Sequence, residues 1–182
     1  MNCTSCKNGT LKPNYLDGSL LVHQCTNCKG NWLYISDYLR WLELGGKTKQ
    51  NNASTTINIE ESNKALLCPV SGSLMTKYKI SHDSTHRLDF SASANGVWLD
   101  SGEWELLKEK SLSHSLTDVF TSHWQKELRS QEAKTVLSTI YQGQFGNDDY
   151  EKIKQTKTWL DSNPNKAKLI AYLLDENPYS TH

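Results

Sequence analysis

Two closely spaced pairs of cysteines near the start of the 182-residue chain constrain its fold more than any other feature. Cys3 and Cys6 form the first pair, and Cys25 and Cys28 form the second. The two-residue spacing within each pair lets a tight backbone turn direct both sulfurs at one tetrahedral ion. The pattern predicts one structural metal site with four sulfur ligands, because four thiolates complete the tetrahedron.

The segment between the two pairs has the pattern of a β-hairpin. Residues 10–16 and 19–24 flank the dipeptide Asp17-Gly18. This dipeptide favours a tight hairpin turn, because both central positions of that turn need positive φ. Gly9, just after the first pair, is expected to turn the chain with positive φ as well. The hairpin would bring the second cysteine pair back beside the first.

Zinc is the expected ion, at one per chain, and iron stays open because a rubredoxin-like site uses the same four sulfurs. A redox role for one pair is the less favoured alternative, since two pairs that converge across a hairpin favour a closed, inert site. His23 lies near Cys25 but is expected to be a strand residue, because the tetrahedron is already complete. Five cysteines, four of them paired, fit metal ligands in a reducing compartment better than a disulfide framework.

An apolar segment and a short helix are expected after the second pair. Residues 32–35 supply apolar side chains that a module this small needs. Ser36 is placed to cap a helix over residues 37–43, and Gly45-Gly46 to end it.

The first 44 residues carry a combination of motifs found together in one family. The residues are Cys3-x-x-Cys6, Cys25-x-x-Cys28 and Gly30-x-Trp32-Leu33. They resemble the zinc ribbon of the transcription factor IIB type, in the bacterial form whose second cysteine pair continues as Gly-x-Trp-Leu-Asp-x-Gly-Glu. Tyr34 replaces the Asp of that pattern, and Ser36-Asp37 replaces Gly-Glu. The resemblance implies a bacterial protein with a zinc-binding ribbon, and it implies transcription only through the family name.

The Gly-x-Trp-Leu signature occurs a second time, at residues 96–99. The positions that correspond to the four cysteines hold Cys68, Ser71, Ser91 and Ala94. Three of four ligands are therefore missing, which predicts a degenerate copy of the module without a metal. Asp100 and Glu103 follow the signature, as in the family pattern, and resemble a capping box for a helix through residue 110. A metal site built from Cys68, His82 and His86 is the less favoured alternative, because both histidines lie in the turn of the predicted hairpin.

We expect an α+β protein with two small zinc-ribbon-like β-hairpin modules, the second packed with a C-terminal helical region. Its parts would be a zinc ribbon with intact ligands at 1–46, a flexible linker at 47–64, a degenerate zinc-ribbon-like module at 65–112 and helices at 113–182. The linker is polar, so the two modules are expected to move independently.

The C-terminal region has apolar residues at helical spacing. Residues 116, 120, 124 and 128 are apolar at intervals of four, and residues 148–160 and 164–174 repeat the amphipathic pattern. These helices are expected to cover one face of the second module. A dimer surface or a groove for a partner is the alternative use of the same faces.

Composition and motifs argue against several functions. The chain has 20 Lys and Arg and 20 Asp and Glu, so no global field draws it to nucleic acid or anionic lipid. No apolar run approaches the roughly 18 residues of a membrane span, and no signal pattern is present, which predicts a soluble, cytoplasmic protein. No catalytic motif is present, and a closed metal site leaves no position for substrate, so we expect no enzyme.

Two functions remain. The favoured one is a non-catalytic zinc-binding scaffold that acts as a protein-interaction adaptor, because repeated modules and a helical extension build surface rather than chemistry. The alternative is a nucleic-acid-associated zinc ribbon with a transcription-related role and weak binding. Its candidate contacts are Lys7, Lys12, Lys29, Arg40, Tyr15 and Trp32. The sequence identifies neither the protein partner nor the oligomeric state.

Overall fold

A computed structural model of the chain describes residues 1–48 and 64–179. Nearly all of the predicted linker at 47–64 thus lies outside the described residues. The chain divides into two compact units, Met1–Gln131 and Glu132–His182. We describe each unit by itself.

The first module, residues 1–46, contains a hairpin, a third strand and a helix. These elements are β1 (Leu11–Leu16), β2 (Leu20–Cys25), β3 (Asn31–Tyr34) and α1 (Ile35–Glu43). Asp17 and Gly18 form the hairpin turn with φ of 50° and 86°, as their sequence predicts. Helix α1 begins before Ser36, and Ser36 is not its cap: the N-cap is Tyr34 and makes no side-chain hydrogen bond. The Ile35 N–H instead donates to the Asn95 carbonyl at 3.0 Å.

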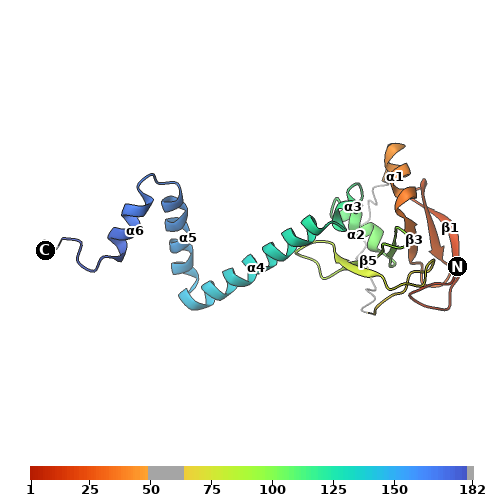
Figure 1. The fold of residues 1–182 in the computed structure, drawn as a ribbon, viewed down its shortest axis with the longest axis horizontal. Coiled ribbons are helices and arrows are strands. Elements are labelled where there is room, and N and C mark those ends of the chain that lie inside the picture. The colour runs from red at the N-terminus through yellow and green to blue at the C-terminus, as the bar shows by residue number, and fades with distance from the viewer. Residues whose placement is uncertain (49–63, 180–182) are drawn as a thin grey trace. The chain divides into compact units, whose positions relative to one another are not determined.

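The second module, residues 65–112, has the same order of elements. They are β4 (Thr76–Lys79), β5 (Arg87–Ser91), β6 (Gly96–Leu99) and α2 (Glu103–Glu109). In both modules a hairpin is therefore followed by a third strand and then by a helix. Figure 1 shows the strands of both modules beside each other in one unit.

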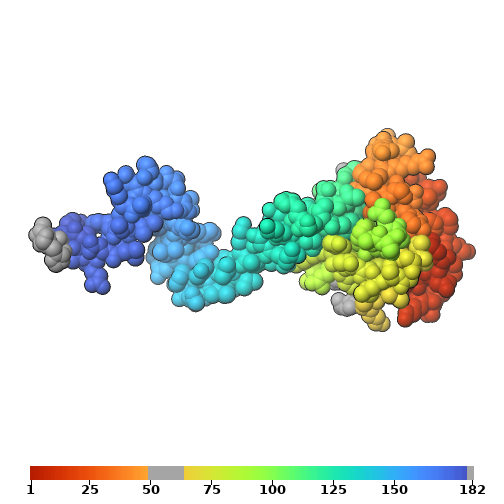
Figure 2. Space-filling model, in the orientation of Figure 1, coloured from red at the N-terminus to blue at the C-terminus, as the bar shows by residue number. Residues whose placement is uncertain are grey.

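All six of these strands belong to one antiparallel sheet with the order β1-β2-β3-β6-β5-β4. The third strand of each module lies at the centre, where Trp32 pairs with Trp98 and Tyr34 pairs with Gly96. The prediction of an α+β fold is confirmed. The prediction that the modules move independently is wrong, because β3 and β6 share backbone hydrogen bonds across the centre of the sheet. In the space-filling view the two modules form one continuous body (Figure 2).

Successive side chains along β3 and β6 point alternately to two buried clusters, one on each face of the sheet. Leu33, Val97 and Leu99 face the larger cluster, which also contains Trp41 from α1 and Trp104 from α2. The neighbouring residues Trp32 and Trp98 face a smaller cluster that contains Cys3, Cys25, Cys68 and Met75. This period of two places the cysteines on the opposite face of the sheet from helices α1 and α2.

Side chains of α2 also bind the turn of the first hairpin. The Trp104 Nε1–H donates to Asp17 Oδ2 at 2.8 Å, and Lys108 Nζ forms an ion pair with Asp17 Oδ1 at 3.0 Å. Asp17 is thus both a turn residue and the acceptor that joins the first module to α2.

The next segment packs against this sheet, as predicted for the C-terminal region. It comprises α3 (Leu116–Val119) and the start of α4 (Ser122–Phe145). Leu116 and Val119 are fully buried, and the Trp124 Nε1–H donates to the Ile80 carbonyl at 3.1 Å. The Tyr38 hydroxyl accepts from the Leu116 N–H at 3.0 Å, which ties α1 to α3.

The second unit contains the end of α4 together with α5 (Asn147–Asp161) and α6 (Lys166–Leu174). Neither α5 nor α6 contains a buried residue. The expectation that these two helices cover one face of the second module stays a prediction. Among residues 1–48 and 64–179, no helix is both long enough and apolar enough to cross a membrane.

Candidate metal centre

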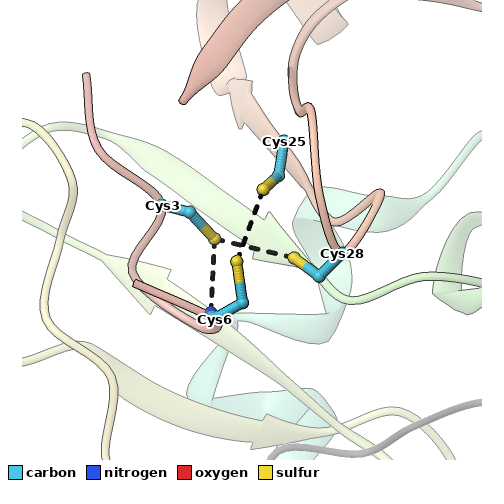
Figure 3. A group of neighbouring side chains, drawn as sticks. All are labelled: Cys3, Cys6, Cys25 and Cys28. Carbon is cyan, nitrogen blue, oxygen red and sulfur yellow. Dashed lines mark hydrogen bonds between the residues drawn. The ribbon is translucent and has the colours of Figure 1, made fainter. Parts of the chain in front are cut away.

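Four cysteine sulfurs meet beside the first hairpin. Cys3 and Cys6 lie before β1, Cys25 ends β2, and Cys28 lies in the turn that leads to β3. Their Sγ atoms all lie within 4.8 Å of one another, and Figure 3 shows all four side chains directed at one point. The structure therefore brings together all four residues that the sequence predicts as ligands.

The spacing of the sulfurs fits a tetrahedral ion. The Sγ atoms of Cys3 and Cys28 are 3.6 Å apart, and so are those of Cys6 and Cys25. A zinc ion with Zn–S bonds of about 2.3 Å requires sulfur–sulfur distances of about 3.8 Å. A disulfide would need about 2.05 Å, and all four cysteines are free. The residues present thus fit zinc.

Backbone turns aim the sulfurs and stabilise their negative charge. Cys3 Sγ accepts from the Cys6 N–H, and Cys25 Sγ accepts from the Asn27 N–H, both at 3.4 Å. Lys7 and Lys29 follow the two pairs with φ of 59° and 63°. The turn that the sequence assigns to Gly9 is thus made by Lys7.

Gly9 has a different role, because a Cβ atom there would lie 2.2 Å from Cys25 Sγ. Only glycine leaves room for this sulfur. The expected positive φ is absent from Gly9, so the residue is needed for close approach rather than for the turn.

The thiols lie in different environments. Cys3 and Cys25 are buried, whereas Cys6 and Cys28 are half-buried. Burial raises the pKa of Cys3 and of Cys28, and a hydrogen bond with the Asn27 side chain lowers the pKa of Cys6. Four thiolates this close repel one another, so a cation is needed to hold all four in the ionised form.

The Gly-x-Trp signatures of the two modules pack against each other. A Cβ atom at Gly30 would lie 2.3 Å from Trp98 Cζ2, and one at Gly96 would lie 2.4 Å from Trp32 Cζ2. Each indole therefore covers the glycine of the other module. Sequence reasoning missed this contact, although the signal was present in the repetition of the same three-residue pattern.

The two turns of the second module resemble those of the first. Cys68 Sγ accepts from the Val70 and Ser71 N–H groups at 3.4 Å, and Ser91 Oγ accepts from the Ala94 N–H at 3.4 Å. An isolated β-bridge joins residues 67 and 74, as another joins residues 2 and 10 in the first module.

Hydroxyl groups fill the region that corresponds to the metal site. Ser93 Oγ lies 2.8 Å from Ser71 Oγ, 2.7 Å from Ser73 Oγ and 3.1 Å from Ser91 Oγ. Burial raises the pKa of the Cys68 thiol, but hydrogen bonds with Ser71 and Ser91 outweigh burial and lower it overall. Neutral hydroxyls, those of Ser71 and Ser91, thus stand at two of the four positions where the first module has cysteines.

The alternative metal site at Cys68, His82 and His86 does not form. Within the part of the chain that the structure describes, only the four cysteines of the first module are close enough together to share an ion. His23 lies in β2, opposite Trp32, and contacts the Tyr34 ring edge-on.

The candidate nucleic-acid contacts differ in exposure. The basic side chains of Lys7, Lys12, Lys29 and Arg40 are exposed, and Tyr15 is 60% exposed. Trp32 is fully buried because it packs on Gly96. The prediction that Trp32 stacks on bases is therefore wrong.

Comparison with known proteins finds a family similar to the first module. The profile of a family described as "Transcription factor zinc-finger", of the TFIIB zinc-ribbon type, matches residues 2–44. No curated protein and no solved structure matches the chain. The matched segment contains all four cysteines and ends at α1.

Proposed function

We propose that this protein is a non-catalytic, cytoplasmic scaffold that binds one zinc ion per chain and recruits a protein partner through its C-terminal helices. The close arrangement of four cysteine sulfurs in the first module is the evidence for the zinc ion. A tetrahedron of four sulfurs leaves no open position for substrate or water, which supports a structural role for the metal.

The second module is a degenerate copy of the first in this proposal. It has the same order of hairpin, strand and helix, and the same bridge before its first turn. Cys68 and Ser91 accept backbone N–H groups at positions that correspond to those of Cys3 and Cys25. The serine hydroxyls that contact Ser93 in this module support the proposal that it binds no metal.

The exposed apolar surface of the second unit is the observation that carries the adaptor role. Helices α5 and α6 bury no residue, yet Trp159 is 52% exposed and Leu173 is 63% exposed. The end of α4 adds a stripe of exposed apolar side chains: Val136, Leu137, Ile140, Tyr141 and Phe145. Helices as short as α5 and α6, with 15 and 9 residues, are marginal in water unless an apolar face is covered. A protein partner would cover these faces.

Charge substitutions on this surface test the adaptor role. The full chain with Ile140→Glu and Trp159→Glu should lose a partner that the wild type retains on a column from nuclease-treated native lysate. The matched control carries Thr139→Glu and Thr156→Glu, which add the same charges at exposed polar positions, and it should retain the partner. If both variants retained the partner equally, the proposed adaptor role of this surface would be wrong.

The family description favours one second candidate, a nucleic-acid-associated ribbon. Lys7, Lys12 and Lys29 are exposed on the module that matches the family. Fluorescence anisotropy with mixed-sequence DNA and RNA, at low and at moderate salt, separates the two functions. Salt-dependent binding that weakens when these three lysines become alanine supports the second candidate. No binding at low salt supports the adaptor.

A further inference from the structure

Helix α2 begins with a buried acid. Glu103 is only 1% exposed, and its Oε2 atom accepts the Asp100 N–H at 2.7 Å. Its Oε1 atom is also buried and has no hydrogen-bond partner among the described residues. An ionised carboxylate with an unpaired oxygen is costly at such a position, because burial removes the water that would solvate it.

Three charged groups face Glu103; the two carboxylates increase the cost of its ionised form, and the one lysine reduces it. They are Asp100 from the turn before α2, Asp89 from β5 and Lys77 from β4. Asp89 and Asp100 are buried, and Lys77 Nζ already pairs with Asp89 Oδ2 at 2.8 Å. With all three carboxylates ionised the group has a net charge of 1 − 3 = −2, and one bound proton reduces this to −1.

Both effects act on Glu103 in the same direction. Burial first, and then the nearby Asp100 carboxylate, raises the pKa of Glu103 well above its usual value. The Asp100 side chain is itself held in place, because its Oδ1 atom accepts the Trp98 Nε1–H at 2.7 Å.

We propose that Glu103 is a neutral carboxylic acid in the folded protein and that its proton holds α2 against the sheet, which makes the joint between the two modules sensitive to pH. The part of this joint that α2 makes consists of two bonds, through Trp104 and Lys108, to Asp17 in the first module, in addition to the pairing of β3 with β6. Both donors lie within two turns of Glu103 on the same helix. Loss of the proton places a second unbalanced charge under α2 and loosens these bonds.

The direction of the pH effect follows from proton binding. The folded protein keeps the Glu103 proton at pH values where the unfolded chain has released it. Folding is then linked to proton uptake, so stability falls as pH rises from the usual pKa of a glutamic acid, about 4.3, toward the raised folded value. Metal binding to the cysteines has its own pH dependence, but this is common to variants of Glu103 and cancels in a comparison.

Urea unfolding of the zinc-loaded full chain tests the proposal, with Glu103→Gln as the variant that imitates the neutral acid. The folding equilibrium constant of E103Q relative to wild type should rise by up to tenfold per pH unit across this window. The matched control is Glu105→Gln on the same helix, whose ratio to wild type should stay nearly constant. A constant ratio for E103Q as well would overturn the proposal.

Two measurements keep the proposal testable if E103Q does not fold. Wild-type protein with ¹³C-labelled glutamate carboxyl groups should show one signal of a protonated acid at neutral pH, and titration of every glutamate at its usual pKa would overturn the proposal. Hydrogen exchange should show the Trp104 indole N–H opening more often as pH rises, after correction for intrinsic exchange. Unchanged opening would overturn the role of the proton at the joint.

Discussion

The two modules place similar turns in one sheet but hold them together differently. In the first module four sulfurs converge, and in the second Cys68 lies among serine hydroxyls. The second module has additional apolar support, since Leu107, Leu116 and Val119 are fully buried against the shared sheet. A structural zinc ion contributes on the order of 10 kcal/mol to a small module. The comparison teaches that similar turns can be held in one sheet by four converging sulfurs in one module and by helical packing in the other.

The two central tryptophans differ in whether their indole N–H has a hydrogen-bond partner. The Trp98 Nε1–H donates to Asp100, whereas the Trp32 Nε1 atom is buried and has no partner among the described residues. The residue that corresponds to Asp100 is Tyr34, which contacts Trp32 edge-on. The second module thus has acidic residues after the signature, and the first has the four cysteines.

The largest effect should come from removing one ligand of the first module. Cys25→Ser leaves three sulfurs, and we expect loss of the metal and of ordered structure in β1–β3, with a loss of apparent stability on the order of 10 kcal/mol. Metal analysis and circular dichroism measure both. Cys68→Ser is the control and should still hold one zinc per chain. If C68S lost its zinc, the conclusion that only the first module holds the metal would be wrong.

The next largest effect should come from restoring the missing ligands. The triple variant Ser71→Cys, Ser91→Cys and Ala94→Cys completes four thiols around Cys68, and we expect two zinc ions per chain by metal analysis. The control adds the same number of thiols at three exposed serines outside the two turns that hold Cys68 and Ser91, namely Ser101, Ser122 and Ser130, and it should stay at one zinc. A single zinc in both variants would show that the second module is no degenerate metal site.

A smaller effect is expected at the central glycines. Gly30→Ala and Gly96→Ala each force a methyl group into an indole, and each should lower the free energy of unfolding by about 1–3 kcal/mol. Similar losses would show that both modules depend equally on this contact. Gly143→Ala in α4 meets nothing within 4 Å and should instead stabilise by up to about 1 kcal/mol. Urea midpoints measure all three, and a neutral G30A would contradict the reciprocal packing.

Local features of the fold could be predicted from the sequence, whereas contacts between distant segments could not. The cysteine spacing and Asp17-Gly18 act over a few residues, so they indicate the metal site and the hairpin turn directly. The pairing of β3 with β6 joins distant segments; Trp32 and its partner Trp98, for example, are 66 positions apart in the sequence. A Gly-x-Trp pattern does not say which glycine an indole covers.

The roles of individual apolar residues were also hard to predict. The helical spacing of residues 148–174 is the same whether a helix packs in a core or binds a partner, so the exposure of α5 and α6 had no sequence signal. The sequence around Trp32 is compatible with an exposed stacking residue, because its burial depends on the contact with Gly96 in the other module. These uses differ in what lies opposite the side chain, which periodicity does not record.

The central position of β3 has a consequence for synthesis on the ribosome. The first module is complete at residue 46, but its partner strand β6 ends at Leu99. Chain elongation at about 5–20 residues per second leaves the β3 edge open for roughly 3–11 s before that strand has been made. During this interval the nascent ribbon has an unpaired strand edge and an uncovered Trp32, both open to wrong pairing. A metal ion bound early would hold the two cysteine pairs of the ribbon together until its second half arrives.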